Sequence, residues 1–323
     1  MKIDNISDQL ILITGGCGFL GKQLALRLSK KNNVILASRN NYLSQQASNE
    51  TGCETIPLDV ANIESVKDCI IKHKPDIVIH AAATKYVDLA EKNPNECIDI
   101  NVIGSQNIAR ISIENKVKIL VGISTDKAAS PVSNTYSLTK SLMERLFCNL
   151  NQYSTTKFVC VRFGNIAWST GSVFCTWYQM MKSNNLILST GPQMRRFFFS
   201  VDEACNLVIK SIEEIDRLKG KVISQKMKSA MISSILDIWS KLFNCTWKKI
   251  DQRPGDKIDE YLIGKHELEN TCSFKDKDQV FYIIDFYNKY KDCILEEYST
   301  YNSEKLSVDE ITDLIKMKPN NLI

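Results

Sequence analysis

The chain has 323 residues, of which 44% are hydrophobic and 24% charged, proportions typical of a packed globular protein and not of a disordered one. Its 41 Lys and Arg exceed its 37 Asp and Glu by four, and the charges are mixed along the chain, so no basic run predicts a nucleic-acid-binding face. The apolar stretches are far shorter than the ~20 residues of a membrane span and no signal peptide is evident, so we expect a cytoplasmic protein with no membrane contact.

The eleven cysteines form no CxxC pair, and the three histidines lie far apart in the sequence. Without a secretion signal, this cysteine pattern predicts free thiols instead of a disulfide framework. We therefore expect neither a metal site nor catalysis by a histidine-based triad.

The first predicted element is a strand at residues 9–14 (QLILIT), a short apolar run rich in β-branched residues. It leads into a turn in which Gly15, Gly18 and Gly21 recur every third residue, followed by helical spacing of apolar residues. A strand, a glycine turn and a helix in this order bring backbone and unpaired N–H groups close to a pyrophosphate. The spacing differs from G-x-G-x-x-G and a glycine cluster alone could be a plain turn, but its position favours a dinucleotide site.

The second predicted strand, residues 33–37, ends in Ser38 and Arg39. NAD sites commonly place an acidic residue here to bind the ribose 2′-hydroxyl, whereas an arginine suits a 2′-phosphate. Because no acidic residue lies between Asn32 and Asn49, the sequence favours NADP over NAD. The alternative is that Arg39 is a solvated loop residue.

Two further strands are predicted at residues 54–58 and 76–80. The first leads to Asp59, which could contact the adenine amino group or cap the turn. The second ends in three small residues that permit cofactor approach, Ala81, Ala82 and Ala83. Strands and helices that alternate in this way imply an α/β fold with a doubly wound parallel sheet and ligand at the carboxyl ends of its strands.

The regular alternation of strands and helices ends near residue 166. We therefore expect a Rossmann-type nucleotide-binding domain at residues 1–165, with its sheet completed by later segments. Residues 166–323 are then expected to form a smaller substrate-binding lobe and a C-terminal tail.

The predicted chemistry follows the strand at residues 117–123, where the STDK segment at residues 124–127 precedes a helix that begins near Tyr136. Tyr136 and Lys140 are four residues apart and share one helix face. A lysine ammonium beside a phenol lowers the pKa of the phenol, which predicts a base usable near neutral pH. A lone YxxxK usually marks a solvated helix face, but after STDK and a glycine-rich turn it indicates catalysis.

Together, the segment at residues 14–21, Thr125 and the Tyr136/Lys140 pair resemble extended short-chain dehydrogenases/reductases. Within these, the STDKA segment followed by Pro131 resembles the inverting UDP-N-acetylglucosamine 4,6-dehydratases. The related dTDP-glucose dehydratases carry Asp-Glu where this chain has Asp-Lys. Further matching segments lie along the whole chain, at residues 80–87, 91–108, 161–165, 171–173, 194–199, 253–260 and 298–311.

The resemblance implies an NADP cofactor, a UDP-sugar substrate, self-association into a homo-oligomer, and three sets of site residues. The catalytic residues would be Thr125, Asp126, Lys127, Tyr136 and Lys140. The cofactor-binding residues would be Gly15, Gly16, Cys17, Gly18, Phe19, Leu20, Ser38, Arg39, Asp59, Val60, Ala81, Ala82, Ala83, Lys85 and Asn101, with Tyr136 and Lys140. The substrate-binding residues would be Lys85, Asn165, Gly171, Ser172, Val173, Arg196, Arg253 and Asp256.

The chemistry of a diphosphate supports a substrate-binding role for Arg196 and Arg253, because a diphosphate favours bidentate guanidinium contacts. The alternative for Arg196 is a surface residue beside the core phenylalanines at residues 197–199. The chain also departs from the family pattern. Residues 130–135 carry one extra residue, and Trp168 and Thr170 stand where the family has Gly and Arg. The family arginine is expected near the substrate, so its replacement by Thr170 leaves the exact nucleotide or sugar open. Arg195 is a candidate to compensate in part for that missing arginine.

The implied mechanism has three steps. Tyr136 takes the proton of the 4-hydroxyl while hydride leaves C4 for NADP. Lys127 then removes the C5 proton as Asp126 protonates the hydroxyl that departs from C6, and hydride returns to C6. We expect burial and Lys140 to lower the pKa of Lys127, with Asp126 opposing that shift.

Two other functions remain open at this stage. An NADP-dependent keto-sugar 4-reductase or epimerase would use the same Tyr136/Lys140 pair but would not need Asp126 and Lys127. A non-catalytic NADP-binding protein would not need the Tyr136/Lys140 pair either.

Overall fold

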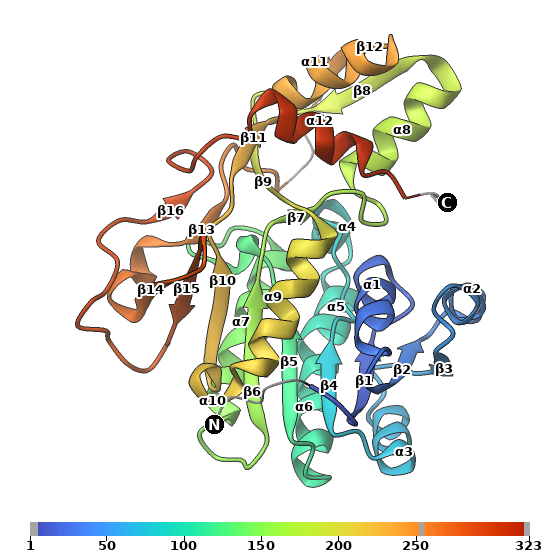
Figure 1. Cartoon of the computed structure of the whole chain (residues 1–323), viewed down its shortest axis with the longest axis vertical. Helices are drawn as coiled ribbons and strands as arrows, with labels where there is room; N and C mark the ends of the chain where they lie inside the picture. Colours follow the sequence, from blue (N-terminus) through green and yellow to red (C-terminus); the bar gives the residue numbers. More distant parts are fainter. Residues whose placement is uncertain (1–5, 252–254, 320–323) are drawn as a thin grey trace.

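The computed structural model describes residues 6–251 and 255–319. Within them, a nine-stranded sheet runs in the order β14-β15-β10-β6-β5-β4-β1-β2-β3 (Figure 1). The strands from β10 to β3 are parallel, and β15 is antiparallel to both β10 and β14. Their bounds are β1 Leu10–Thr14, β2 Asn33–Ser38, β3 Glu54–Pro57, β4 Ile77–His80, β5 Ile119–Ile123, β6 Lys157–Arg162, β10 Lys221–Gln225, β14 Thr271–Asp276 and β15 Gln279–Ile284. The predicted α/β class with a doubly wound, Rossmann-type sheet is confirmed.

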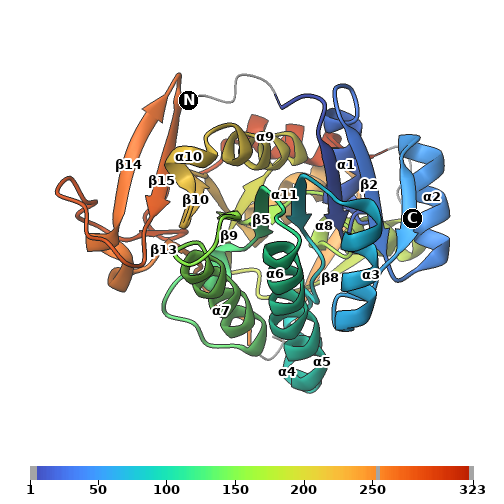
Figure 2. The ribbon, with the colours of Figure 1, turned by 90° about the horizontal axis from the view of Figure 1, so that it is seen from below.

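Helices cover both faces of this sheet (Figure 2). One face carries α1 (Phe19–Leu28), α2 (Asn41–Thr51), α9 (Val201–Glu213) and α10 (Ile215–Leu218), and the other carries α3 (Ile63–His73), α6 (Gly104–Glu114) and α7 (Thr135–Leu150). Three short elements, α4 (Val87–Lys92), α5 (Pro94–Ile98) and the π-helix η1 (Asp99–Ile103), lead into α6. Among the described residues, no helix is both long and apolar enough to cross a membrane.

The contact of α7 with the sheet sets the position of Tyr136 and Lys140. A Cβ atom at Gly122 of β5 would lie 2.8 Å from the ring of Phe147 on α7, so glycine is needed for this close packing. Asn134 caps the helix by accepting a hydrogen bond from the Ser137 backbone N–H. The first turn of α7 therefore lies beside the carboxyl end of β5, where ligands bind in open parallel sheets.

The second lobe lies above the carboxyl ends of the strands (Figure 1). Its helices are α8 (Val173–Asn184), α11 (Ile232–Phe243) and α12 (Val308–Lys316). Its strands are β7 (Asn165–Ile166), β8 (Leu186–Thr190), β9 (Arg195–Phe199), β11 (Ser229–Met231) and β12 (Thr246–Ile250). Trp168, Phe174, Trp177 and Trp239 form its buried aromatic core.

The strand β9 joins the cores of the two lobes. Phe197 and Phe199 are buried in the core of the main sheet, whereas Phe198, on the opposite face, is buried in the core of the second lobe. The alternation of side chains along a strand explains how one segment serves both cores. The interpretation of these phenylalanines as core residues is confirmed.

A fully buried guanidinium, Arg162 on β6, ties three parts of the chain together. It donates to both carboxylate oxygens of Glu144 on α7, at 3.0 and 2.6 Å, and to both of Glu267, at 3.0 and 2.9 Å. It also donates to the Leu262 carbonyl at 2.9 Å, within β13 (Tyr261–Ile263). Two short elements complete this region, η3 (Lys265–Asn270), which carries Glu267, and β16 (Tyr298–Ser299), which pairs with β13.

Replacing Glu144 with alanine tests this cluster. The Glu144→Ala substitution leaves a buried guanidinium with one carboxylate partner, and we expect the free energy of unfolding to fall by about 3–5 kcal/mol. Urea denaturation followed by circular dichroism measures the change. Glu269→Ala, which breaks an exposed pair with Lys289, is the control and should have no measurable effect. A Glu144→Ala variant as stable as the control would contradict a structural role for the cluster.

Candidate functional site

The carboxyl ends of β1, β4 and β5 open into a cleft of about 420 Å³. The glycine turn lies on one side of it and the first turn of α7 on the other. The predicted residues that line it are Gly15, Gly18, Phe19, Leu20, Ser38, Ala81, Ala82, Ala83, Lys85, Thr125, Lys127, Tyr136, Lys140 and Asn165. The structure thus brings most of the predicted cofactor and catalytic residues to one cleft.

The glycine turn is packed so closely that side chains are excluded. Gly15 has a positive φ of 66°, and a Cβ atom there would lie 2.7 Å from the Ala82 backbone nitrogen. A Cβ atom at Gly21 would lie 2.4 Å from the Gly16 carbonyl oxygen. This turn and the N-terminus of α1 form a cradle in which backbone can approach a pyrophosphate, as a dinucleotide requires.

Several residues predicted to bind the cofactor do not line the cleft. Gly16 packs against the Ile13 carbonyl, and Cys17 is buried with its thiol near Ser44. Arg39 is exposed, outside the residues that line the cleft. Asp59 accepts a hydrogen bond from the Ala61 N–H at 3.1 Å, which matches the turn-capping alternative.

Two more of these residues have structural contacts. Val60 packs against Gly104, where a Cβ atom would lie 2.7 Å from its methyl group. Asn101 is buried, accepts from the Thr84 N–H at 2.8 Å and donates to the Thr139 hydroxyl at 3.1 Å. Asn101 therefore links the loop after β4 to α7.

Thr125, Asp126 and Lys127, which follow β5, form a compact cluster, and the last two lie in the 3₁₀ helix η2 (Asp126–Ala128). Asp126 is fully buried, and its Oδ1 accepts from the Thr125 hydroxyl at 2.9 Å and from Lys127 Nζ at 3.1 Å. Its other oxygen, Oδ2, is buried without a hydrogen-bond partner among the described residues. A buried, unpaired carboxylate oxygen is costly, which is typical of a group kept for chemistry.

The pKa of Tyr136 differs from the sequence expectation. Burial raises it to about 12, while the charge of Lys127 and the Thr125 hydroxyl act in the opposite direction. Burial also lowers the pKa of Lys140 to about 8, and Lys140 Nζ lies 3.2 Å from the Met143 sulfur. The prediction that Lys140 lowers the pKa of Tyr136 is therefore wrong for this structure, because desolvation of the phenol outweighs the charges near it.

The expected fall in the pKa of Lys127 is also wrong. Burial acts to lower it, but the carboxylates of Asp126 and Glu260 outweigh burial and raise it. Glu260 Oε1 lies 3.5 Å from Lys127 Nζ. Sequence reasoning missed Glu260, although it ends the matched segment at residues 253–260, because only Arg253 and Asp256 were assigned there.

A second cavity, of about 270 Å³, adjoins the cleft on the side of the second lobe. Predicted substrate residues that line it are Lys85, Asn165, Gly171, Ser172, Val173, Arg196 and Asp256. Arg253 lies outside the described residues. Arg196 is only 9% exposed, so it is not a surface residue. Lys85 and Asn165 line both cavities and connect them.

The two departures near this cavity have clear structural roles. Trp168 adopts a positive φ of 61°, and its indole N–H donates to the Leu314 carbonyl of α12 at 2.8 Å. Thr170 contributes its backbone carbonyl, which accepts a hydrogen bond from Lys85. Arg195 makes a two-bond pair with Asp259, at 2.6 and 2.6 Å, so its guanidinium is committed there and does not replace the missing arginine.

Comparisons with known proteins show which families and structures the chain is similar to. The family described as "Polysaccharide biosynthesis protein" matches residues 11–281. An inverting UDP-N-acetylglucosamine 4,6-dehydratase of Campylobacter jejuni is 31% identical over 82% of this chain and 80% of that protein. A UDP-glucose 4-epimerase of Rickettsia bellii is 30% identical over 95% of each chain. The crystal structure of Pen from Bacillus thuringiensis is 28% identical, with a TM-score of 0.88 over 98% of this chain and 99% of that one.

The Rossmann sheet, the glycine cradle and the cluster after β5 define a nucleotide-sugar dehydratase or epimerase of the extended short-chain dehydrogenase/reductase fold. Within that class, the chain belongs to the polysaccharide biosynthesis protein family.

The buried ammonium of Lys140 generates a stability prediction. The folded chain releases this proton at about pH 8, whereas the unfolded chain holds it to about pH 10.5. The unfolded state therefore binds more protons between these values, and stability should rise with pH across that window. At pH 7 the Lys140→Met variant avoids burial of the charge and should be more stable by about 1–4 kcal/mol.

Urea denaturation at pH 7 and pH 10 measures both effects. The advantage of Lys140→Met over the wild-type protein should shrink at the higher pH, because the wild-type amine is then neutral when folded. Equal stability of the two proteins at pH 7 would contradict a charged, desolvated Lys140.

Proposed function

We propose that the chain is a nucleotide-sugar 4,6-dehydratase that converts UDP-N-acetylglucosamine to a UDP-4-keto-6-deoxy-N-acetylhexosamine for deoxy-amino-sugar or glycan biosynthesis. The observation that carries the proposal is the buried Asp126–Lys127 pair, of which Lys127 lines the same cleft as Tyr136 and Lys140. Oxidation at C4 needs only the tyrosine and lysine, whereas loss of water from C6 also needs an acid and a base. The 31% identical dehydratase supports this choice.

The cleft fits a nicotinamide dinucleotide, because the glycine turn excludes side chains where a pyrophosphate would lie. When bound, NADP would supply the hydride acceptor for oxidation at C4 and the hydride donor for reduction at C6. Tyr136 takes the proton of the 4-hydroxyl, which requires the phenolate. Because Tyr136 is desolvated in the described structure, its ionisation needs a positive charge nearby, which Lys127, Lys140 and the bound nicotinamide would provide.

The elimination can be written with one proton transfer inside the Asp126–Lys127 pair. Lys127 Nζ donates to Asp126 Oδ1 at 3.1 Å, so movement of this proton gives a neutral amine and a protonated carboxyl. The neutral amine then takes the C5 proton, and the carboxyl gives its proton to the hydroxyl that leaves C6. The pair thus acts as one coupled unit.

Arg196 and the segment at residues 171–173 are proposed to hold the sugar nucleotide. The guanidinium of Arg196 lines the second cavity with Asp256 and Lys85, and an arginine there suits a diphosphate. Gly171 has a positive φ of 74° and packs on the Tyr86 ring, which lets the backbone turn at the cavity wall.

The alternatives differ at one feature. A 4-reductase or 4-epimerase would use Tyr136 and Lys140, and the 30% identical epimerase shows that such relatives exist. Neither reaction includes an elimination, so neither requires the buried Asp126–Lys127 pair. A non-catalytic NADP-binding protein would need none of these four groups.

We further propose that the protein acts as a homo-oligomer in the cytoplasm. Exposed apolar side chains gather on α4, α5, η1 and α7, a surface that a second copy could cover. These side chains are Leu89, Ile98, Ile103, Leu138 and Leu142. All eleven cysteines are free thiols, which is usual in a reducing compartment.

The cofactor preference is tested at Arg39. Ser38 lines the cleft and the exposed Arg39 follows it, so its guanidinium is free to reach a 2′-phosphate. Arg39→Ala should weaken NADP binding by about 1.5–3 kcal/mol and leave NAD binding unchanged. Isothermal titration calorimetry with both cofactors measures this. Purified protein that holds only NAD, with unchanged NADP affinity in the variant, would show the preference to be wrong.

The division of labour is tested by three variants. Tyr136→Phe should lose all hydride transfer, because the 4-hydroxyl then keeps its proton. Asp126→Asn and Lys127→Ala should still oxidise C4 but slow the elimination by about 10²–10⁴-fold. Single-turnover absorbance of the reduced nicotinamide measures both steps with UDP-N-acetylglucosamine. If the Asp126 and Lys127 variants dehydrate at the wild-type rate, the reductase or epimerase alternative becomes the better account.

A further inference from the structure

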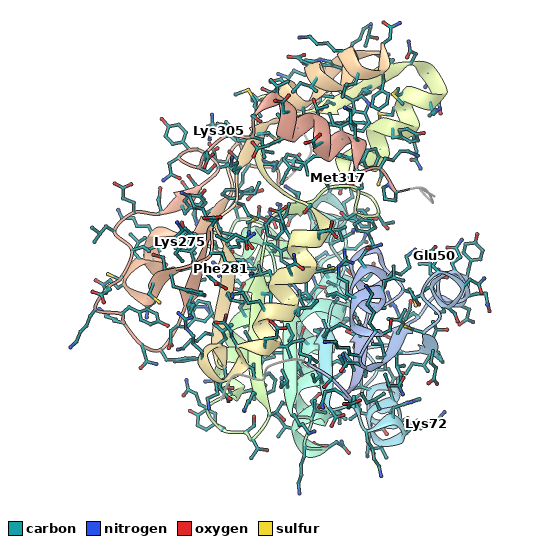
Figure 3. All side chains as sticks on the ribbon, viewed as in Figure 1. Glu50, Lys72, Lys275, Phe281, Lys305 and Met317 are labelled. Carbon is teal, nitrogen blue, oxygen red and sulfur yellow. The ribbon has the colours of Figure 1, made fainter. Side chains whose placement is uncertain are left out.

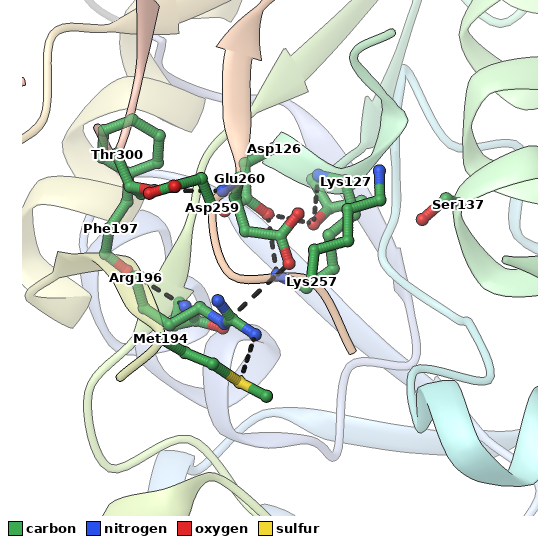
Figure 4. A network of polar contacts seen from close by, with 12 residues as sticks. Asp126, Lys127, Ser137, Met194, Arg196, Phe197, Lys257, Asp259, Glu260 and Thr300 are labelled. Atoms are coloured by element: carbon green, nitrogen blue, oxygen red, sulfur yellow. Dashed lines mark hydrogen bonds and ion pairs between the residues drawn. The ribbon is translucent and has the colours of Figure 1, made fainter. Parts of the chain in front are cut away.

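A buried carboxylate, Glu260, contacts both Lys127, which lines the cleft, and Arg196, which lines the second cavity (Figure 4). Its side chain is 5% exposed, and one oxygen, Oε1, lies 3.5 Å from Lys127 Nζ and 3.9 Å from Arg196 Nε. The same oxygen thus faces the amine of the proposed elimination pair and the arginine of the substrate cavity. These distances suit charge attraction more than a strong hydrogen bond.

The backbone of Glu260 is fixed by the C-terminal tail. Its N–H donates to the Thr300 hydroxyl at 3.0 Å, and its carbonyl accepts from the Thr300 N–H at 2.8 Å. The Thr300 hydroxyl also donates to Asp259 at 2.8 Å. Lys305, labelled in Figure 3, donates to the Thr300 carbonyl. The tail segment at residues 298–311 therefore has a structural task, which is to hold Asp259 and Glu260 against the site.

Charges from three parts of the chain meet at Glu260. The cations are Lys127 from η2, Arg196 from β9 and Lys257 from the loop before β13, and the carboxylates are Asp126 and Glu260 itself. Tyr136 of α7 faces Asp126 and Lys127. Lys257 donates to the Pro131 carbonyl, and burial lowers its pKa. Without Glu260, the three cations would share a single carboxylate, a costly arrangement in a desolvated site.

We propose that Glu260 is a positioning residue that holds the Lys127 ammonium in the site and sets the pH at which that amine gives up its proton. The role of this pH in turnover rests on the proposed dehydratase function, but the titration of Lys127 does not. An opposite charge within about 4–6 Å shifts a pKa by about 1–3 units, and Glu260 Oε1 lies closer than that to Lys127 Nζ, at 3.5 Å.

Competitive acylation of lysines in the wild-type protein and in Glu260→Gln tests the proposal without substrate. Only a neutral amine reacts with acetic anhydride, so the acylation rate of Lys127, relative to exposed lysines, reports its neutral fraction. In Glu260→Gln, loss of the negative charge should lower the pKa of Lys127 by about one unit. The neutral fraction of Lys127 at pH 8, and with it the acylation rate, should then rise about tenfold. Peptide mass spectrometry measures the rates, and circular dichroism checks the fold.

Two further variants sharpen the test. Asp259→Asn removes the neighbouring carboxylate, which pairs with Arg195 and not with Lys127, so Lys127 should keep its wild-type rate. Glu260→Asp keeps the negative charge but places it one methylene group farther from Lys127. The acylation rate of Lys127 in this variant should therefore lie between the rates in the wild-type protein and in Glu260→Gln. This variant also serves if Glu260→Gln does not fold.

The outcomes separate this proposal from the function. An unchanged Lys127 rate in a folded Glu260 variant, or an equal increase in Asp259→Asn, would overturn the role of Glu260. In wild-type protein that dehydrates UDP-N-acetylglucosamine, the alkaline limb of the elimination rate should move by about one unit to lower pH in Glu260→Gln. If the wild-type protein does not dehydrate UDP-N-acetylglucosamine, the dehydratase proposal is refuted. If Lys127 is then still acylated about tenfold faster in Glu260→Gln than in the wild-type protein, the pairing of Glu260 with Lys127 is supported.

Discussion

The buried guanidinium of Arg162 is the interaction on which the geometry of the site depends. One end of it fixes Glu144 on α7, one turn beyond Lys140 of the proposed catalytic pair, and the other fixes Glu267 after β13. It also binds the Leu262 carbonyl, two residues beyond Glu260. The Ser124 hydroxyl donates to Glu144 at 2.6 Å, so the end of β5 joins the same cluster. Strand, helix and C-terminal segment thus meet at one charge, which desolvation makes intolerant of a missing partner.

The site above this cluster is governed by a balance of burial and charge. Burial raises the pKa of Tyr136 and lowers that of Lys140, whereas the two carboxylates beside Lys127 raise its pKa despite burial. The same desolvation makes the interactions in the site strong, because charges attract more strongly where water is excluded. Shifted pKa values of this kind cluster at sites where protons are transferred.

The sequence was sufficient for features that depend on local patterns. The glycine turn, the strand before it and the helix after it follow from residues within about 20 positions, and β5 with its STDK segment likewise. Glu260 could not be found in this way, because its partner Lys127 is distant in sequence and neither residue signals the other. The pKa directions were also wrong, since they depend on burial that only the packed chain reveals. The role of Arg195 could not be predicted for the same reason, because its ion pair with Asp259 joins residues that are far apart in the sequence.

The central claim is that hydride taken from C4 returns to C6 of the same sugar. UDP-N-acetylglucosamine with deuterium at C4, incubated with the protein and no added reductant or oxidant, tests this directly by NMR and mass spectrometry of the product. The account predicts a 4-keto-6-deoxy sugar with the deuterium in its C6 methyl group. A product that keeps deuterium at C4, or a 6-deoxy product without the label, would contradict it.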